Sequence, residues 1–85
     1  MSVYYFSSPT CEPCKKLKPV VEDLKEEFPS LQWISVNIQN DPEELAKKYG
    51  VTVVPTIVVD SAKGIERHTG TVAMGYYRIL RNATN

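Results

Sequence analysis

The sequence predicts a single α/β domain, with a four-stranded mixed sheet and helices on both of its faces. Segments rich in β-formers alternate with segments whose apolar residues recur every three or four positions. The first two strands are joined by a helix and should therefore be parallel, whereas a short polar turn should pair the last two as an antiparallel hairpin. The chain of 85 residues is long enough for one compact domain and too short for two.

The first half of the chain is expected to hold two strands around a long helix. Residues 3–7 are rich in β-formers and end at a Ser-Ser-Pro interruption, which predicts a first strand followed by a loop. Across residues 11–28 the apolar side chains keep the spacing of one helix face, and Pro29 ends the helix. Residues 31–38 alternate apolar with polar side chains, which predicts the second strand.

A helix is expected at residues 41–50, since Asp41 can cap it, Pro42 suits a first helical position and Gly50 can end it. The apolar segment 51–60 should then form the third strand. Because a proline cannot donate to a strand ladder, Pro55 interrupts this strand and needs a physical reason.

The chain should end in a hairpin and a helix. Residues 60–64 have the composition of a turn, and residues 65–69 should form a strand that returns beside the third. The last helix is expected at residues 72–81. Its inner side should carry Val72, Tyr76, Ile79 and Leu80.

Charge and hydropathy exclude several classes of function. Ten basic and ten acidic residues cancel, and no basic stripe stands out, so a nucleic-acid partner is not expected. No apolar run approaches the ~20 residues needed to cross a bilayer, so no membrane partner is expected either. The N-terminus lacks the features of a secretory signal, which predicts a cytoplasmic protein.

Cys11 and Cys14 form the one strong functional motif of the sequence. They are separated by two residues at the start of a helix that follows a strand. Side chains three positions apart share a helix face, so the two sulfurs can bond with little backbone movement. A disulfide across so short a loop adds little stability, which favours a redox role over a structural one.

The two cysteines are expected to have different tasks. The helix N-terminus offers free N–H groups and a partial positive charge, which favour the thiolate of Cys11 and make it the nucleophile. Cys14 lies on the apolar face and should be the shielded, resolving thiol. Pro13 suits the first turn, whereas the carboxylate of Glu12 opposes a thiolate, an effect that its exposure and the nearby Lys15 and Lys16 should reduce.

The cysteine pair could also have one of three roles without redox chemistry. A zinc site usually needs four protein ligands, and with His68 as the only histidine it would require a second copy of the chain. A structural disulfide is disfavoured by the cytoplasmic prediction. Two unreactive core cysteines would account for Cys14 but not for Cys11. His68 is expected to be a surface residue on the hairpin.

These residues resemble the thioredoxin family over nearly the whole chain. The resemblance lies in a strand followed by Cys-x-x-Cys-Lys, in Pro19 five residues after the second cysteine, and in Tyr-Gly-Val-Thr-Val-Val-Pro-Thr at residues 49–56. It implies a cis Val54–Pro55 bond that faces the cysteines, with the Val54 backbone open to an extended substrate. Gly70 and Gly75 resemble the last strand-to-helix connection. The substrate-binding residues implied are Thr10, Pro13, Val54, Pro55 and Gly70.

The chain also departs from typical thioredoxins. It resembles the shorter forms that lack an extra N-terminal strand and helix. Thr10 stands where the family usually has tryptophan, and Glu12-Pro13 stands where it usually has Gly-Pro. Tyr5 replaces a buried aspartate, so proton transfer from Cys14 needs other assistance.

The function expected from this resemblance is the reduction of protein disulfides, with roles in electron transport and cell redox homeostasis. We expect no bound cofactor and no metal, a monomeric state, and electrons from NADPH through a flavin-dependent thioredoxin reductase. One alternative is a glutathione-dependent glutaredoxin, although the segment after Gly70 lacks the small acidic motif of that family. Another is a binding module that holds a partner by the surface around Pro55.

Overall fold

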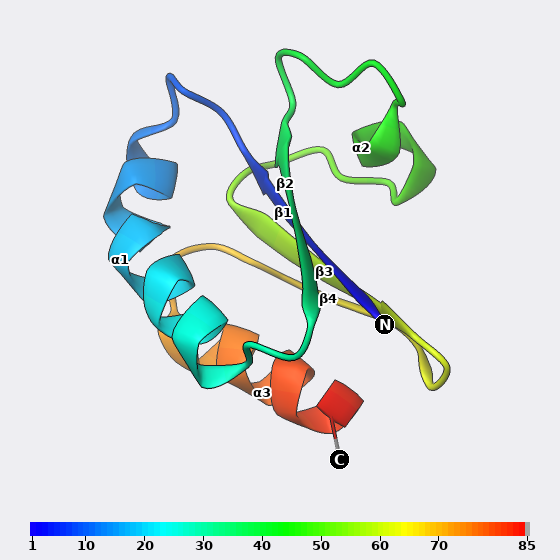
Figure 1. Ribbon diagram of the computed structural model, residues 1–85. Coiled ribbons are helices and arrows are strands. Elements are labelled where there is room, and N and C mark those ends of the chain that lie inside the picture. The colour runs from blue at the N-terminus through cyan, green and yellow to red at the C-terminus, as the bar shows by residue number, and fades with distance from the viewer. Residues whose placement is uncertain (85) are drawn as a thin grey trace.

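The computed structural model describes residues 1–84, where four strands and three helices follow the predicted order (Figure 1). The elements are β1 (Ser2–Ser7), α1 (Glu12–Glu27), β2 (Gln32–Asn37), α2 (Leu45–Lys48), β3 (Thr56–Ser61), β4 (Gly64–Thr69) and α3 (Ala73–Thr84). No helix in this range is long and apolar enough to cross a membrane.

The strands form one mixed sheet in the order β2-β1-β3-β4. β1 and β2 are parallel, as the helical crossover predicts, whereas β3 runs antiparallel to both β1 and β4. The ends of β1, β2 and β4 therefore meet the beginning of β3 at one edge of the sheet (Figure 1). The loops at this edge, which we call the active edge, carry the cysteines and Pro55.

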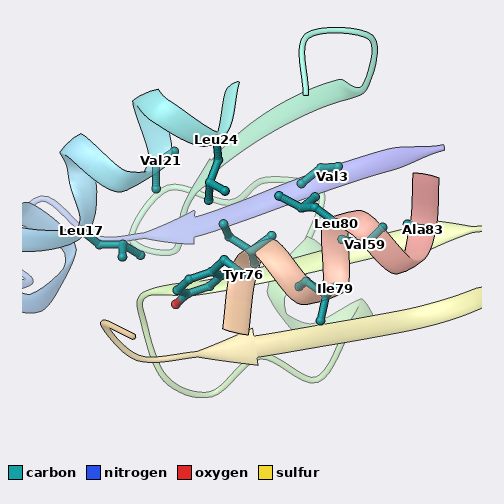
Figure 2. Close-up of a cluster of buried hydrophobic side chains, with 10 residues drawn as sticks. Val3, Leu17, Val21, Leu24, Val59, Tyr76, Ile79, Leu80 and Ala83 are labelled. Atoms are coloured by element: carbon teal, nitrogen blue, oxygen red, sulfur yellow. The ribbon is translucent and has the colours of Figure 1, made fainter. Parts of the chain in front are cut away.

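Helices cover both faces of the sheet, as predicted. α1 and α3 pack on one face around the larger core cluster (Figure 2), and the shorter α2 lies on the other. The larger cluster consists of Val3, Leu17, Val21, Leu24, Ile57, Val59, Tyr76, Ile79, Leu80 and Ala83. The smaller cluster consists of Phe6, Val36, Tyr49 and Val58. Alternate residues of β1 and β3 thus serve opposite faces, as a pleated strand requires.

Helix α1 buries the face that its spacing predicts. Its buried side chains are Cys14, Leu17, Val21 and Leu24. Cys11 is the N-cap residue, and the helix continues through Pro19 to Glu27. Because the first turn of this helix lies at the active edge, the fold of α1 itself places the cysteines there.

The helix predicted at residues 41–50 is shorter in the structure, where α2 spans only Leu45–Lys48. The chain first makes a turn closed by Glu44 N–H on the carbonyl oxygen of Asp41 at 3.0 Å, and Glu44 itself has φ of 53°. This left-handed residue prevents a helix from starting at Pro42. The Asp41 carboxylate still caps α2, because it accepts from Leu45 N–H at 3.0 Å and Ala46 N–H at 2.9 Å.

Helix α3 begins later and extends further than predicted. Val72 precedes its first residue and is 65% exposed, so the inner position predicted for Val72 is wrong. Tyr76, Ile79 and Leu80 are buried as expected. The chain enters α3 through Gly70, whose φ of 111° disfavours any other residue and lets the loop turn sharply at the active edge.

Candidate active site

The two cysteines occupy one turn at the N-terminus of α1. Cys11 has an extended backbone (φ −89°, ψ 112°), and its Sγ accepts a hydrogen bond from Cys14 N–H at 3.2 Å. Both are free thiols. A backbone donor of the helix end therefore points at the Cys11 sulfur, which is the arrangement that stabilises negative charge there.

The two thiols differ in exposure. Cys11 is partly exposed, whereas Cys14 is only 5% exposed. Burial first, and then the contact with Cys11, raise the pKa of the Cys14 thiol to about 11, although the backbone of Ser8 acts in the opposite direction. The shielding predicted for Cys14 is therefore present, and this thiol keeps its proton at neutral pH.

The loop before β3 brings Val54 and Pro55 to the cysteines. The Val54–Pro55 peptide bond is cis, and the Cys11 thiol lies 3.7 Å from the carbonyl oxygen of Val54, to which it donates. Pro55 is buried and precedes β3 instead of lying within it, so its missing N–H removes nothing from the ladder. Residues 43 positions apart in the chain thus form one surface.

Gly70 and Tyr76 hold this loop in place. Gly70 N–H donates to the carbonyl oxygen of Pro55 at 3.2 Å. The hydroxyl of the buried Tyr76 donates to the carbonyl oxygen of Gly70 and lies 3.3 Å from that of Pro55. The sequence identified Gly70 but not the supporting role of Tyr76, because its apolar spacing indicated only a core residue.

Thr10 and Pro13, the other predicted substrate-binding residues, lie on either side of Cys11 and are exposed. Gln39, which the sequence analysis missed, donates through Nε2 to Thr10 Oγ1 and to Ser8 Oγ, both at 2.9 Å. These bonds connect the loop after β2 to the loop before α1. No sequence signal points to Gln39, since an isolated glutamine in a polar turn is ordinary.

A hollow lies beside Cys14, on the side of β1 and β2. Its volume is about 380 Å³. Its lining consists of Tyr5, Ser7, Ser8, Pro9, Cys14, Lys15, Lys18, Val21, Glu22, Lys25, Ser35 and Asn37. Tyr5 is half-buried there, and burial together with the nearby Cys14 raises the pKa of its phenol.

The charge next to Cys11 is partly neutralised. Lys15 Nζ lies 3.2 Å from Glu12 Oε1, and both side chains are largely exposed. An exposed pair of this kind contributes little to stability. It does place a cation beside the carboxylate of Glu12, as the sequence analysis expected.

The prediction that His68 is a surface residue on the hairpin holds only in part, because His68 lies on the edge strand β4 but is half-buried. Its ring packs edge-on against Tyr76, with centroids 4.7 Å apart, and its Nε2 atom is buried without a hydrogen-bond partner among residues 1–84. A Cβ on Gly75 would lie 2.3 Å from that ring, so the ring occupies space that only glycine leaves free. Within the same residues, no cluster of three His, Cys, Asp or Glu side chains could hold a metal ion.

Comparisons with known proteins agree with this geometry. The family model described as Thioredoxin matches residues 1–75. Among solved structures, thioredoxin from Fasciola hepatica superimposes with a TM-score of 0.82 at 30% identity, covering 95% of this chain and 78% of that one. Thioredoxin f from spinach chloroplast gives 0.86 at 25% identity, covering 99% and 76%.

Curated relatives show the same similarity over part of their length. Thioredoxin from Chlamydia trachomatis is 36% identical over 66 residues, which is 76% of this chain and 64% of the relative. Putative thioredoxin H10 from Arabidopsis thaliana is 38% identical over 56 residues, which is 66% of this chain and 36% of the relative. The chain therefore spans less than two thirds of the length of these relatives.

Proposed function

This chain belongs to the thioredoxin family, and from that premise we propose that it is a thiol-disulfide oxidoreductase that reduces disulfide bonds in proteins. The observation that carries the proposal is the position of the Cys11 thiol. It lies at a helix N-terminus, accepts a backbone N–H, and is 3.7 Å from the carbonyl oxygen of Val54 beside the cis bond.

The surroundings of Cys11 support a protein as the substrate. Four exposed apolar side chains lie on the loops of the active edge or directly after them: Ile38, Val53, Val72 and Met74. Such a rim favours contact with an apolar polypeptide segment. The backbone of Val54 can pair with that segment as an added strand, which is compatible with any sequence around the disulfide.

The proposed reaction has two steps. The Cys11 thiolate attacks one sulfur of the substrate disulfide, the substrate S–S bond breaks, and the other sulfur leaves with the electron pair and takes a proton. Cys14, after losing its own proton, attacks Cys11 Sγ and releases the second substrate sulfur. The protein becomes the Cys11–Cys14 disulfide while the substrate gains two electrons and two protons.

We propose that electrons come from NADPH through a flavin-dependent thioredoxin reductase, and that the chain itself binds no cofactor. Insulin reduction should run with NADPH and a thioredoxin reductase, or with dithiothreitol. The rate should be far lower with glutathione and glutathione reductase. Equal rates with the two donor systems would contradict the assignment and favour a glutaredoxin.

Substitution of each cysteine tests the order of attack. Cys14→Ser should still attack and then remain as a mixed disulfide with its substrate, visible by intact mass spectrometry and reversed by dithiothreitol. Cys11→Ser should form no such adduct, because Cys14 is buried and keeps its proton. If Cys11→Ser traps substrate, or if neither variant does, the assigned roles are wrong.

A further inference from the structure

The proposed resolving step requires a proton to leave Cys14, and the buried side of this residue offers no group that can take it. On this buried side, the titratable groups near Cys14 are Cys11 at the N-cap of α1, Tyr5 in β1 and Tyr76 in α3. Burial raises the pKa of both phenols, so neither can accept a proton at neutral pH. From β2, only the uncharged Ser35 and Asn37 face the hollow beside Cys14.

The hollow, which Cys14 lines and Val54 does not, is open to solvent. Its volume of about 380 Å³ is many times the roughly 30 Å³ that one water molecule occupies in the liquid. Polar side chains of Ser7, Ser35 and Asn37 line it, and such side chains can hydrogen-bond to water. Water can therefore approach the Cys14 thiol while the substrate covers Cys11.

Cations outnumber carboxylates around this hollow. Lys15, Lys18, Lys25 and Glu22 line it, all on α1. Lys15 forms an ion pair with Glu12. Lys18, one helical turn after Cys14, forms no ion pair with any of residues 1–84. Positions i and i+4 share a helix face, with Cβ atoms about 5–6 Å apart. Glu22 lies eight residues after Cys14, about 12 Å along the helix axis.

We propose that Cys14 loses its proton to solvent in this hollow, where the ammonium group of Lys18 stabilises the thiolate. The S–H bond of Cys14 breaks, and water or hydroxide takes the proton. The thiolate then forms the bond to Cys11 Sγ, and the substrate sulfur leaves with the electron pair. This inference rests on the proposed function, because it concerns the second step of the same reaction. Lys18 is a positioning residue that acts through the thiolate and does not touch the substrate.

The experiment follows the mixed disulfide in a single turnover by rapid acid quench and intact mass spectrometry. Its decay gives the resolving rate, and the Cys14→Ser background gives the attack rate alone. With solvent as the acceptor, the resolving rate should rise about tenfold for each pH unit above neutrality, because the fraction of thiolate rises tenfold below its pKa. A plateau near neutral pH would reveal an internal base and overturn the proposal.

Reversal of one charge tests Lys18. Lys18→Glu should slow the resolving step about fivefold at neutral pH and move the pH profile to higher pH, and Lys18→Gln should give about half of that shift. The attack rate in the Cys14→Ser background should not change. Lys16→Glu is the matched control, since Lys16 is exposed on the same helix and does not line the hollow. Equal effects of Lys18→Glu and Lys16→Glu would overturn the role of Lys18.

Glu22→Gln tests the one carboxylate that lines the hollow. The resolving rate should be unchanged or slightly higher, because a carboxylate opposes the thiolate; a slower rate would show that Glu22 takes the proton through water, which contradicts loss to solvent. Failure of the proposed function would look different, because no mixed disulfide would form at any pH. If the mixed disulfide forms but its decay rate does not depend on pH or on the residue at position 18, only this inference fails.

Discussion

At the scale of single residues, the two sulfurs share a helix turn but not an environment. Cys11 is partly exposed beside Val54, whereas Cys14 is buried with its pKa raised to about 11. The sequence predicted this difference, because a cap position is exposed and the third position after it lies on the apolar face. It could not predict the hollow beside Cys14, since residues of β1, α1 and β2 form it together.

Tyr5 tests whether a phenol next to the cysteines takes part in the chemistry. Tyr5→Phe should leave insulin reduction within about twofold of the wild type, because a phenol with a raised pKa cannot accept a proton at neutral pH. The assay is turnover with dithiothreitol, with circular dichroism as the control for folding. A large loss of activity in a folded variant would give the Tyr5 hydroxyl a role in the reaction.

At the scale of elements, the sequence predicted the type and order of every strand and helix but misplaced two helix starts and the start of β3, which was predicted at residue 51 and lies at Thr56. Asp41 and Pro42 have the composition of a helix start, yet Glu44 adopts a left-handed conformation and α2 begins after it. Val72 fits the apolar spacing of α3, yet it lies before the first helical residue and is exposed. In both places the turn that precedes the helix decides where the helix begins, and apolar spacing carries no signal for that turn.

The contact between β4 and α3 gives a prediction about Gly75. Gly75→Ala should destabilise the protein by about 1–3 kcal/mol, because the new Cβ would fall 2.3 Å from the His68 ring, which has to move. Urea unfolding measures the loss. His68→Ser should be less sensitive to the same substitution, so the double variant should be more stable than the sum of the two single effects indicates. Strict additivity would show that the ring and the glycine are not in contact.

At the scale of the whole molecule, two core clusters on opposite faces of one sheet hold the active edge together. The larger cluster joins α1, α3, β1 and β3 (Figure 2). Of these elements, α1 carries Cys14, α3 carries Tyr76, and β3 follows directly after Pro55. The sequence predicted the sheet and its two covered faces, because apolar periodicity specifies which sides are buried. The hydrogen bonds from Tyr76 and Gly70 to the carbonyl oxygen of Pro55 could not be predicted, because they join segments that only the fold brings together.

Leu24 tests whether this core unfolds as one unit. Leu24→Ala removes a fully buried side chain of the larger cluster and should cost about 3 kcal/mol, lowering Tm by roughly 15 °C. Near- and far-ultraviolet circular dichroism should report the same transition. Ile65→Ala is the control, since Ile65 is 54% exposed and its loss should cost under about 0.5 kcal/mol. Separate transitions for the two signals would show that side-chain packing and secondary structure are lost at different stages, so that the core does not unfold as one unit.

The placement of both sulfurs on one turn of α1 has a consequence for how the protein meets its partners. Formation of the Cys11–Cys14 disulfide needs little backbone movement, because the two residues already lie on the same turn. The surface around Val54 and Pro55 should therefore keep its shape in both oxidation states. The protein would then transfer electrons without a change in the conformation of this surface. A substrate could not distinguish the oxidised protein from the reduced one by shape, and the two forms would compete for the same binding site on the substrate. Under the proposed function, the rate of disulfide reduction would accordingly depend on the ratio of reduced to oxidised protein and not on the amount of reduced protein alone.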